Sequence, residues 1–213
     1  DYCMKNIKLL VGALSKWAAG FVLVFLLLFL PASTFCYPGG WRLLALLFIP
    51  MLLLGVFLYI YAPDLLEKRL RGKEERVKQK GVVAWSGLLF VLSFAVAGFD
   101  FRYGWSAMPG WVTWVAGLLL VAAYVMYAEV MRENAWLSRS IEVMDGQRVV
   151  SDGLYGIVRH PMYTATILMF LMMPLVLGSW WAFLVMVPYV LVIVKRINDE
   201  EELLERELDG YLQ

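Results

Sequence analysis

The chain has 213 residues, of which 62% are hydrophobic and only 17% are charged, and its formal net charge is +1. Soluble domains carry roughly 25% charged residues, so this composition excludes an ordinary soluble globule. The near-neutral charge also excludes the strongly basic surface of a nucleic-acid-binding protein. We therefore expect an integral membrane protein with no nucleic-acid partner.

Six apolar segments predict an all-α, polytopic membrane protein. In chain order they are residues 9–30, 43–61, 81–99, 111–130, 163–177 and 180–194. The first four have the length of about 20 residues that crosses the hydrocarbon core of a bilayer. The last two are shorter and would cover about 22 Å each at 1.5 Å per residue. Because only Gly178 and Ser179 separate them, we expect a helical hairpin that need not cross the bilayer completely.

The distribution of Lys and Arg predicts the orientation of these segments. If the N-terminus is cytoplasmic, 16 of the 19 basic residues fall in cytoplasmic segments, only Arg42 and Arg102 fall on the outer side, and Lys16 lies within the first apolar segment. Those cytoplasmic segments are 1–8, 62–80, 131–162 and 195–213. An excess of Lys and Arg is typical of cytoplasmic loops. We therefore expect both termini, and the polar residues next to the last hairpin, to face the cytoplasm.

The sequence gives no indication of a metal site or a disulfide. Cys3 and Cys36 flank the first apolar segment, so we expect them on opposite sides of the membrane and unpaired. One histidine and two distant cysteines do not provide the ligand spacing of a zinc site. Glycine-rich phosphate-binding motifs and a Ser-His-Asp order are also missing from the sequence.

The first of two polar clusters that bracket the hairpin is residues 153–163, Gly-Leu-Tyr-Gly-Ile-Val-Arg-His-Pro-Met-Tyr. It contains His160, the single histidine of the chain. Pro161 suits the first turn of a helix, where its missing N–H costs nothing. The remaining N–H groups of such a turn can meet a carboxylate. A helix that starts here at a membrane surface would present His160 and Tyr163 to a polar ligand.

The second polar cluster follows the hairpin and contains Arg196, Glu200 and Glu201. Arg196 and Glu200 are four residues apart, so they share one face of a helix and are able to pair. Charged residues this close to a membrane segment are costly unless paired and are a default indication of function. Glu202 fits a solvated helix end instead. The two clusters together predict a reaction centre at the membrane surface.

Residues 134–211 resemble the isoprenylcysteine carboxyl methyltransferase family. This family is part of a wider group of integral membrane methyltransferases that includes the phospholipid N-methyltransferases. The matching residues are Asn134, Gly153, Tyr155, Arg159, His160, Pro161, Tyr163, Arg196, Ile197, Glu200, Glu201, Leu204, Leu208, Gly210 and Tyr211. We expect two parts. Residues 1–130 contain transmembrane helices one to four and resemble the family only in being hydrophobic helices, and residues 131–213 form the cytoplasm-facing region for cofactor binding and catalysis with the helical hairpin.

The resemblance also implies S-adenosylmethionine as the methyl donor. The residues implied to bind it are Gln147, Arg148, Val149, Val150, Tyr155, His160, Pro161, Met162, Tyr163, Glu200 and Glu201. In the family, a prenylated cysteine presents its free α-carboxylate to the donor methyl group. Arg196 would hold that carboxylate bidentately, and Glu200 would orient Arg196 and contact the donor. The implied partners are membrane lipids and a lipidated small molecule or prenylated peptide that enters from the bilayer.

Three other functions remain open from the residues alone. Methylation of a phospholipid amine would need a carboxylate such as Glu200 or Glu201 as a base. An NADPH-dependent reductase similar to the sterol reductases would need a basic site for the 2′-phosphate, for which only Arg148 and Arg159 are available. A non-catalytic membrane scaffold would leave both polar clusters without a role. The structural alternatives are a helix cap for His160 and interface anchoring for Tyr155 and Tyr163.

Overall fold

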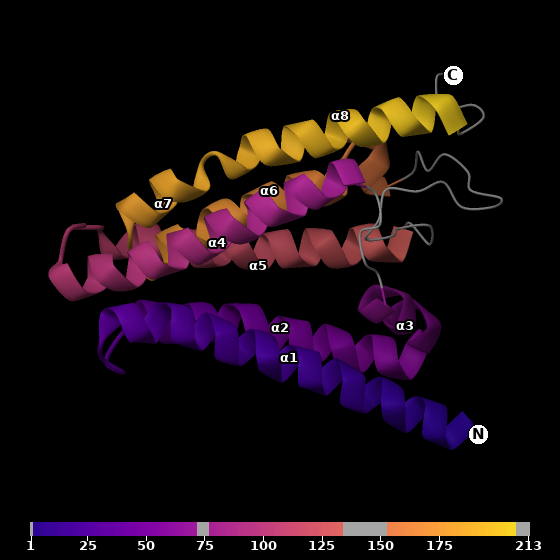
Figure 1. Cartoon of the computed structure of the whole chain (residues 1–213), viewed down its shortest axis with the longest axis horizontal. Coiled ribbons are helices and arrows are strands. Elements are labelled where there is room, and N and C mark those ends of the chain that lie inside the picture. Colours follow the sequence, from indigo (N-terminus) through magenta and orange to yellow (C-terminus); the bar gives the residue numbers. More distant parts are fainter. Residues whose placement is uncertain (1, 72–76, 134–152, 208–213) are drawn as a thin grey trace.

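The computed structural model describes residues 2–71, 77–133 and 153–207, and within this part of the chain all regular structure is helical. The long helices are α1 (Tyr2–Ala32), α2 (Pro38–Tyr61), α4 (Val77–Tyr103), α5 (Gly110–Glu133), α6 (Pro161–Leu177) and α8 (Tyr189–Glu207). The short ones are α3 (Pro63–Arg71), the 3₁₀ turn η1 (Gly153–Gly156) and α7 (Trp180–Met186). The long helices run roughly along one common direction (Figure 1). The expected all-α fold is confirmed.

Five helical stretches are long and apolar enough to cross a membrane. They are Ile7–Ala32, Pro38–Tyr61, Gly81–Tyr103, Gly110–Glu133 and Trp180–Arg206. Helix α6 is a shorter apolar helix of 17 residues. All six segments expected from the sequence are therefore present as helices, and the last two form the expected hairpin.

The second arm of the hairpin is longer than the sequence pattern indicated. We expected it to end at residue 194, but α8 continues to Glu207 because Glu, Leu and Arg are strong helix formers. The short break between α7 and α8 contains Pro188, which lacks the N–H needed to continue a helix. The charged residues after position 194 are part of this helix, as expected for Arg196 and Glu200 from their spacing.

The loop expected over residues 62–80 contains a helix of its own, α3. Pro63 begins it, as suits the first helical position, and Asp64 lies in its first turn, where negative charge is favourable. The Lys16 ammonium, within α1, donates a hydrogen bond of 2.5 Å to the Leu70 carbonyl in the last turn of α3. A cation near the C-terminal carbonyls of a helix stabilises it, so this contact holds α3 against α1.

The exterior of the bundle is apolar, as a bilayer requires. Leu118 on α5 and Leu191 on α8 are 71% and 73% exposed. Large apolar surfaces of this kind are rare on soluble monomers. Inside, the main core combines α1, α2, α4, α5 and α6, and includes Leu28, Leu43, Phe94, Leu120 and Val176. A smaller cluster of Tyr163, Met186, Tyr189 and Ile193 connects α6, α7 and α8 beneath the polar residues described below.

Glycines permit two close approaches between helices. A Cβ atom on Gly98 of α4 would lie 2.6 Å from the Leu28 carbonyl oxygen of α1. A Cβ atom on Gly39 of α2 would lie 2.7 Å from the Leu177 carbonyl oxygen at the end of α6. Small residues at such points allow the tight backbone packing that joins helices in membranes.

A buried polar group at the α6–α7 turn, which we call the Asp100 network, fixes that end of the bundle. It comprises Asp100, Ser106, Ser179 and the Trp180 N–H. Asp100 is 2% exposed and accepts hydrogen bonds from the Ser106 N–H at 2.7 Å, the Ser106 hydroxyl at 2.5 Å and the Ser179 hydroxyl. Ser106 Oγ accepts the Trp180 N–H at 3.0 Å, and Ser179 Oγ accepts the Ala182 N–H at 3.0 Å.

Tyr37 adds a neighbouring polar contact at the same end of the bundle. Its hydroxyl donates to the Leu177 carbonyl oxygen at 3.1 Å, and the Ala97 carbonyl oxygen lies 3.4 Å away. Burial raises the pKa of Tyr37, and the nearby Asp100 carboxylate raises it further, so the hydroxyl stays protonated and remains a donor. Tyr37 therefore ties the start of α2 to the ends of α4 and α6.

Candidate active site

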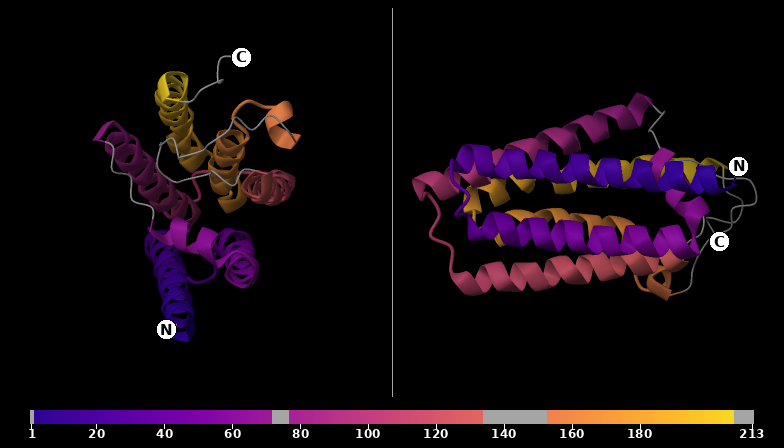
Figure 2. Two further views of the ribbon diagram at one scale, coloured as in Figure 1. Left: turned by 90° about the vertical axis from the view of Figure 1, so that its right-hand side faces the viewer. Right: turned by 90° about the horizontal axis from the view of Figure 1, so that it is seen from below.

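The two polar clusters of the sequence meet at the opposite end of the bundle from the Asp100 network. Helix α6 begins at Pro161, directly after the first cluster, and its partner α8 carries the second cluster on its last turns. In the end-on view of Figure 2, η1 lies beside the ends of α5 and α6, and α8 lies on the other side of α6. Helices α6 and α8 are in contact. The hairpin therefore brings together residues 153–163 and 196–201.

His160 and Glu201 form the main polar contact between these clusters. His160 Nε2 lies 2.9 Å from Glu201 Oε1, and the same oxygen lies 3.3 Å from Arg159 Nε. The side chains of His160 and Glu201 are 17% and 28% exposed, whereas that of Arg159 is 61% exposed. One carboxylate thus holds an imidazole and a guanidinium at the entry to α6.

The side chain of His160 does not cap α6. Its carbonyl oxygen accepts the Thr164 N–H at 3.0 Å and the Thr164 hydroxyl at 3.1 Å, but its imidazole makes no capping hydrogen bond. The structural alternative for this residue, a helix cap, is therefore wrong for its side chain. The imidazole reaches across to α8 instead.

Arg196 and Tyr163 make a second contact between α8 and α6. Arg196 Nε donates to the Tyr163 hydroxyl at 3.2 Å, and Tyr163 is only 5% exposed. The ring centroids of His160 and Tyr163 are 6.0 Å apart, so the two contacts are adjacent. Tyr163 is packed into the small apolar cluster, which explains how a tyrosine at a predicted membrane surface becomes buried.

Glu200 follows Arg196 by one helical turn and has an unsatisfied oxygen. Its Oε2 is buried and has no hydrogen-bond partner among the residues that the structure describes. Its carboxylate lies close enough to the Tyr163 hydroxyl to interact with it electrostatically. Arg196, one turn earlier, bonds the Tyr163 hydroxyl on α6, and the pairing of Arg196 with Glu200 stays a prediction. Glu202, in contrast, pairs with exposed Arg206 at 2.6 Å.

The remaining predicted site residues are only partly covered by the structure. Pro161 is buried at the start of α6, and Met162 packs on the small apolar cluster. Tyr155 is half-buried in η1. The predicted donor-binding residues Gln147, Arg148, Val149 and Val150, together with Asn134, Leu208, Gly210 and Tyr211 of the resemblance, lie outside the described residues.

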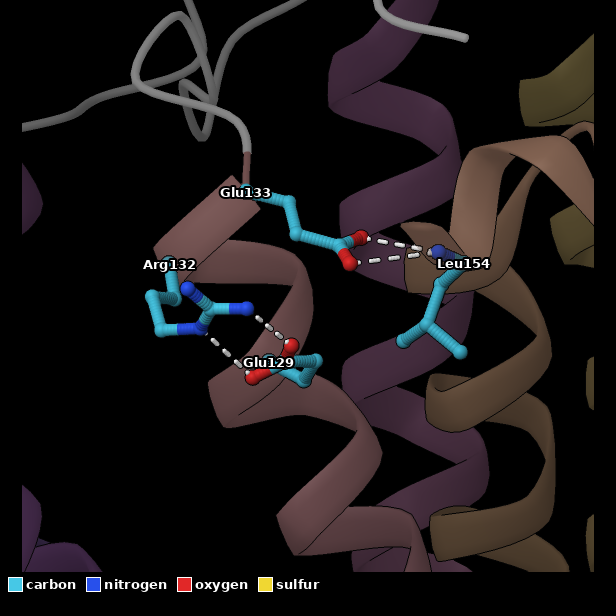
Figure 3. A network of polar contacts seen from close by, with 4 residues as sticks. All are labelled: Glu129, Arg132, Glu133 and Leu154. Atoms are coloured by element: carbon cyan, nitrogen blue, oxygen red, sulfur yellow. Dashed lines mark hydrogen bonds and ion pairs between the residues drawn. The ribbon is translucent and has the colours of Figure 1, made fainter. Parts of the chain in front are cut away.

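Sequence reasoning missed a residue next to this site, Glu133 at the end of α5. Both of its carboxylate oxygens accept the Leu154 N–H, at 3.2 Å for Oε1 and 3.0 Å for Oε2 (Figure 3). One turn earlier, Glu129 pairs with Arg132 at 2.5 Å on the exposed face of α5. A signal was available, since a carboxylate in the last turn of a helix opposes the helix dipole and needs a local donor.

The part of the chain that holds this site was compared with known protein families. Residues 114–206 match the model of the isoprenylcysteine carboxyl methyltransferase (ICMT) family. This part of the chain belongs to the ICMT family. The match extends from α5 into α8 and includes every described residue of the candidate site. Membership implies a methyltransferase that works in a membrane, and it confirms the resemblance seen in the sequence. Neither the curated proteins nor the solved structures gave a match to this chain.

Proposed function

We propose that this ICMT-family chain is an S-adenosylmethionine-dependent methyltransferase that O-methylates the carboxylate of a lipidated, isoprenylcysteine-type acceptor. One observation carries the proposal. Two contacts between α6 and α8, His160–Glu201 and Tyr163–Arg196, stand beside a buried carboxylate oxygen of Glu200 that has no partner in the described part of the chain. All of these residues lie within the family match.

The described residues fit a cationic donor. A buried carboxylate oxygen without a hydrogen bond is costly, so Glu200 Oε2 favours a ligand that brings a donor group or positive charge. S-adenosylmethionine carries an ammonium group and a sulfonium, and when bound it supplies a methyl group on a positively charged sulfur. Glu200 would meet its positive charge, and the rings of His160 and Tyr155 would line the pocket. Gln147, Arg148, Val149 and Val150 stay predicted contacts.

Arg196 is the residue that we assign to the acceptor. The planar guanidinium matches a carboxylate in geometry and charge, and the Tyr163 hydroxyl fixes its orientation through Nε. An α-carboxylate has a pKa of about 3.5, so it is ionised at neutral pH and needs no base. The chain would therefore act by holding the acceptor oxygen in line and by excluding water around nearly buried Tyr163. No covalent intermediate with the chain is required.

Glu201 has a supporting part in this proposal. Glu201 accepts a hydrogen bond from His160 Nε2, which fixes the imidazole against α8, and its ion pair with Arg159 neutralises a nearby guanidinium. The location of the candidate site supports a proposal for its side of the membrane. The N-terminal end of α1, the C-terminal end of α8 and η1 are at the same end of the bundle (Figure 1). We propose that this end faces the cytoplasm, as the distribution of basic residues predicts.

The test uses the purified protein in lipid nanodiscs. It is titrated with S-adenosylhomocysteine and, separately, with NADPH, and then assayed for tritiated methyl transfer to a prenylcysteine and to phosphatidylethanolamine. We expect saturable binding of S-adenosylhomocysteine and label on the prenylcysteine. Binding of NADPH alone would instead favour a reductase, and a protein that binds neither ligand would favour a scaffold.

Phospholipid amine methylation is the second candidate, and the same Glu200 oxygen favours it. A carboxylate whose buried oxygen has no hydrogen bond within the described residues is placed to accept a proton from an ammonium. The pH dependence of the chemical step separates the two functions. Carboxyl methylation should be nearly flat between about pH 6 and 8, because the acceptor is already ionised. A rate on phosphatidylethanolamine that rises steeply over this range would contradict carboxyl methylation.

A further inference from the structure

Glu133 makes a contact that the proposed reaction does not explain. It is half-buried at the C-terminal end of α5, and both carboxylate oxygens accept the Leu154 N–H of η1, 21 residues away in the sequence (Figure 3). Negative charge is unfavourable at this end of a helix. The hydrogen bonds to Leu154 offset that cost, so the carboxylate is tied to the turn that leads into the candidate site.

Gly153 is shaped to receive this carboxylate. Its φ of +59° lies in the left-handed region, which glycine adopts without strain. A Cβ atom at this position would overlap the Glu133 carboxylate. Any other residue at 153 would therefore be strained and would displace Glu133. The two residues form a matched pair, in which the missing side chain of one makes room for the carboxylate of the other.

Backbone hydrogen bonds connect Leu154 to the residues just before His160. The Leu154 carbonyl oxygen accepts the Ile157 N–H at 3.1 Å and the Val158 N–H at 2.9 Å. Leu154 is thus bonded to Glu133 on one side and to the residues just before Arg159 and His160 on the other. These contacts fix a short path from the end of α5 to the two side chains that reach Glu201.

We propose that Glu133 is a positioning residue of the candidate site. By holding Leu154 and Gly153 against α5, it sets the backbone from which His160 reaches Glu201. The inference rests on the proposed function for its consequence in catalysis, but the position of His160 can be measured without any ligand. The proposal depends on the length of the side chain and not on its charge, since the carboxylate must extend far enough to accept the Leu154 N–H.

Two substitutions separate reach from charge. Glu133→Gln keeps the length of the side chain and one acceptor oxygen, but removes the charge. Glu133→Asp keeps the charge, but shortens the side chain by one methylene. Glu129→Asp is the matched control, because Glu129 lies one turn earlier on α5 and pairs with exposed Arg132. Thermal unfolding of each variant shows whether it is folded.

The first measurement is the imidazole NMR signal of histidine-labelled protein, prepared with a tag that contains no histidine. His160 is the single histidine of the chain, so the signal is unambiguous. We expect Glu133→Asp to shift this signal, while Glu133→Gln and Glu129→Asp stay close to wild type. An unshifted signal in folded Glu133→Asp, or a shift in Glu133→Gln that exceeds the one in Glu133→Asp, would overturn the proposal.

The second measurement is the affinity for S-adenosylhomocysteine by calorimetry. Glu133→Asp should weaken this affinity about tenfold, because the Leu154 N–H would lose its acceptor and the backbone that leads to His160 would shift. Glu133→Gln keeps an acceptor oxygen, so its affinity should remain within about threefold of wild type. A purely structural role would lower the active fraction and kcat, and leave the dissociation constant of the folded protein unchanged. If wild type does not bind the ligand at all, the proposed function fails, and the NMR result alone decides the position of His160.

Discussion

Each end of the bundle contains a carboxylate with a buried oxygen, but the two carboxylates differ in their hydrogen bonding. In the Asp100 network, the described contacts supply both Asp100 oxygens with donors and link Ser106 and Ser179 to neighbouring N–H groups. At the candidate site, Glu200 Oε2 is buried and lacks a partner within the described residues. A closed polar network stabilises a fold, whereas an incomplete one costs stability unless a ligand completes it. The comparison thus separates a structural end from the end that holds the candidate site.

The largest effect should come from Arg196. Arg196→Lys keeps the positive charge but removes the planar fork and the Nε–H that bonds Tyr163, so methyl transfer should fall about 100-fold. The affinity for S-adenosylhomocysteine should change little, because we assign Arg196 to the acceptor. The measurement is single-turnover methyl transfer together with calorimetry.

Arg206→Lys is the control for Arg196→Lys, since Arg206 is exposed on the same helix and pairs only with Glu202 among the described contacts. Glu200→Gln should reduce both donor affinity and methyl transfer. If Arg196→Lys and Arg206→Lys have the same rate of methyl transfer, Arg196 does not hold the acceptor, and other residues must bind it.

A smaller effect is expected for His160. His160→Ala should weaken binding of S-adenosylhomocysteine at least about tenfold, or about 1.4 kcal/mol. Glu201→Gln should have part of this effect, because it weakens the acceptor for His160 Nε2. The double variant should lose less binding free energy than the sum of the two single losses. Glu202→Gln is the matched control on the neighbouring exposed position. Strictly additive losses would show that His160 and Glu201 act independently.

Asp100→Asn tests the structural end, where no loss of ligand affinity is expected. The amide has one acceptor oxygen fewer than the carboxylate, so hydroxyl and N–H donors are left without partners. The free energy of unfolding should fall by about 1–3 kcal/mol. Calorimetry with S-adenosylhomocysteine should give the wild-type affinity. A strong loss of affinity in a folded Asp100→Asn variant would mean that the two ends are coupled.

The least invasive test asks which end faces the cytoplasm. Cys36 is free and exposed at the end that holds the Asp100 network, and Cys3 lies near the start of α1. A membrane-impermeant maleimide applied to sealed cells should label Cys36 and miss Cys3, since the basic residues place the N-terminus inside. The reverse labelling would put the candidate site on the outer side.

Much of the fold followed from hydropathy, and the exceptions have physical causes. Apolar length alone located all six apolar helical segments, five of which are long enough to cross a membrane, because a bilayer demands continuous apolar helices. Helix α3 was missed because it is charged, and the apolar segment ended at residue 194, short of the end of α8, for the same reason. For the candidate site, the sequence predicted His160, Arg196 and the two glutamates from their position beside the hairpin; the structure brings them together, and their roles stay predictions.

The pairing within the site was less predictable. Spacing along α8 indicates which of its residues share a face, but it does not indicate that Arg196 bonds Tyr163 or that Glu201 bonds His160. These contacts depend on how α6 and α8 cross, which one-dimensional spacing does not contain. Glu133 was missed for a similar reason, since its partner is a backbone N–H that has no signature in the sequence.

The location of the polar contacts has a consequence for how the sequence of this protein can evolve. Those described for the candidate site come from residues 133–201, while α1 and α2 contribute mainly apolar packing. Apart from close backbone contacts such as the one at Gly39, that packing requires only hydrophobic side chains of suitable volume, and many sequences meet this condition. Substitutions should therefore accumulate faster before α5 than after it, and the N-terminal helices of distant relatives should differ in sequence while they keep their hydropathy.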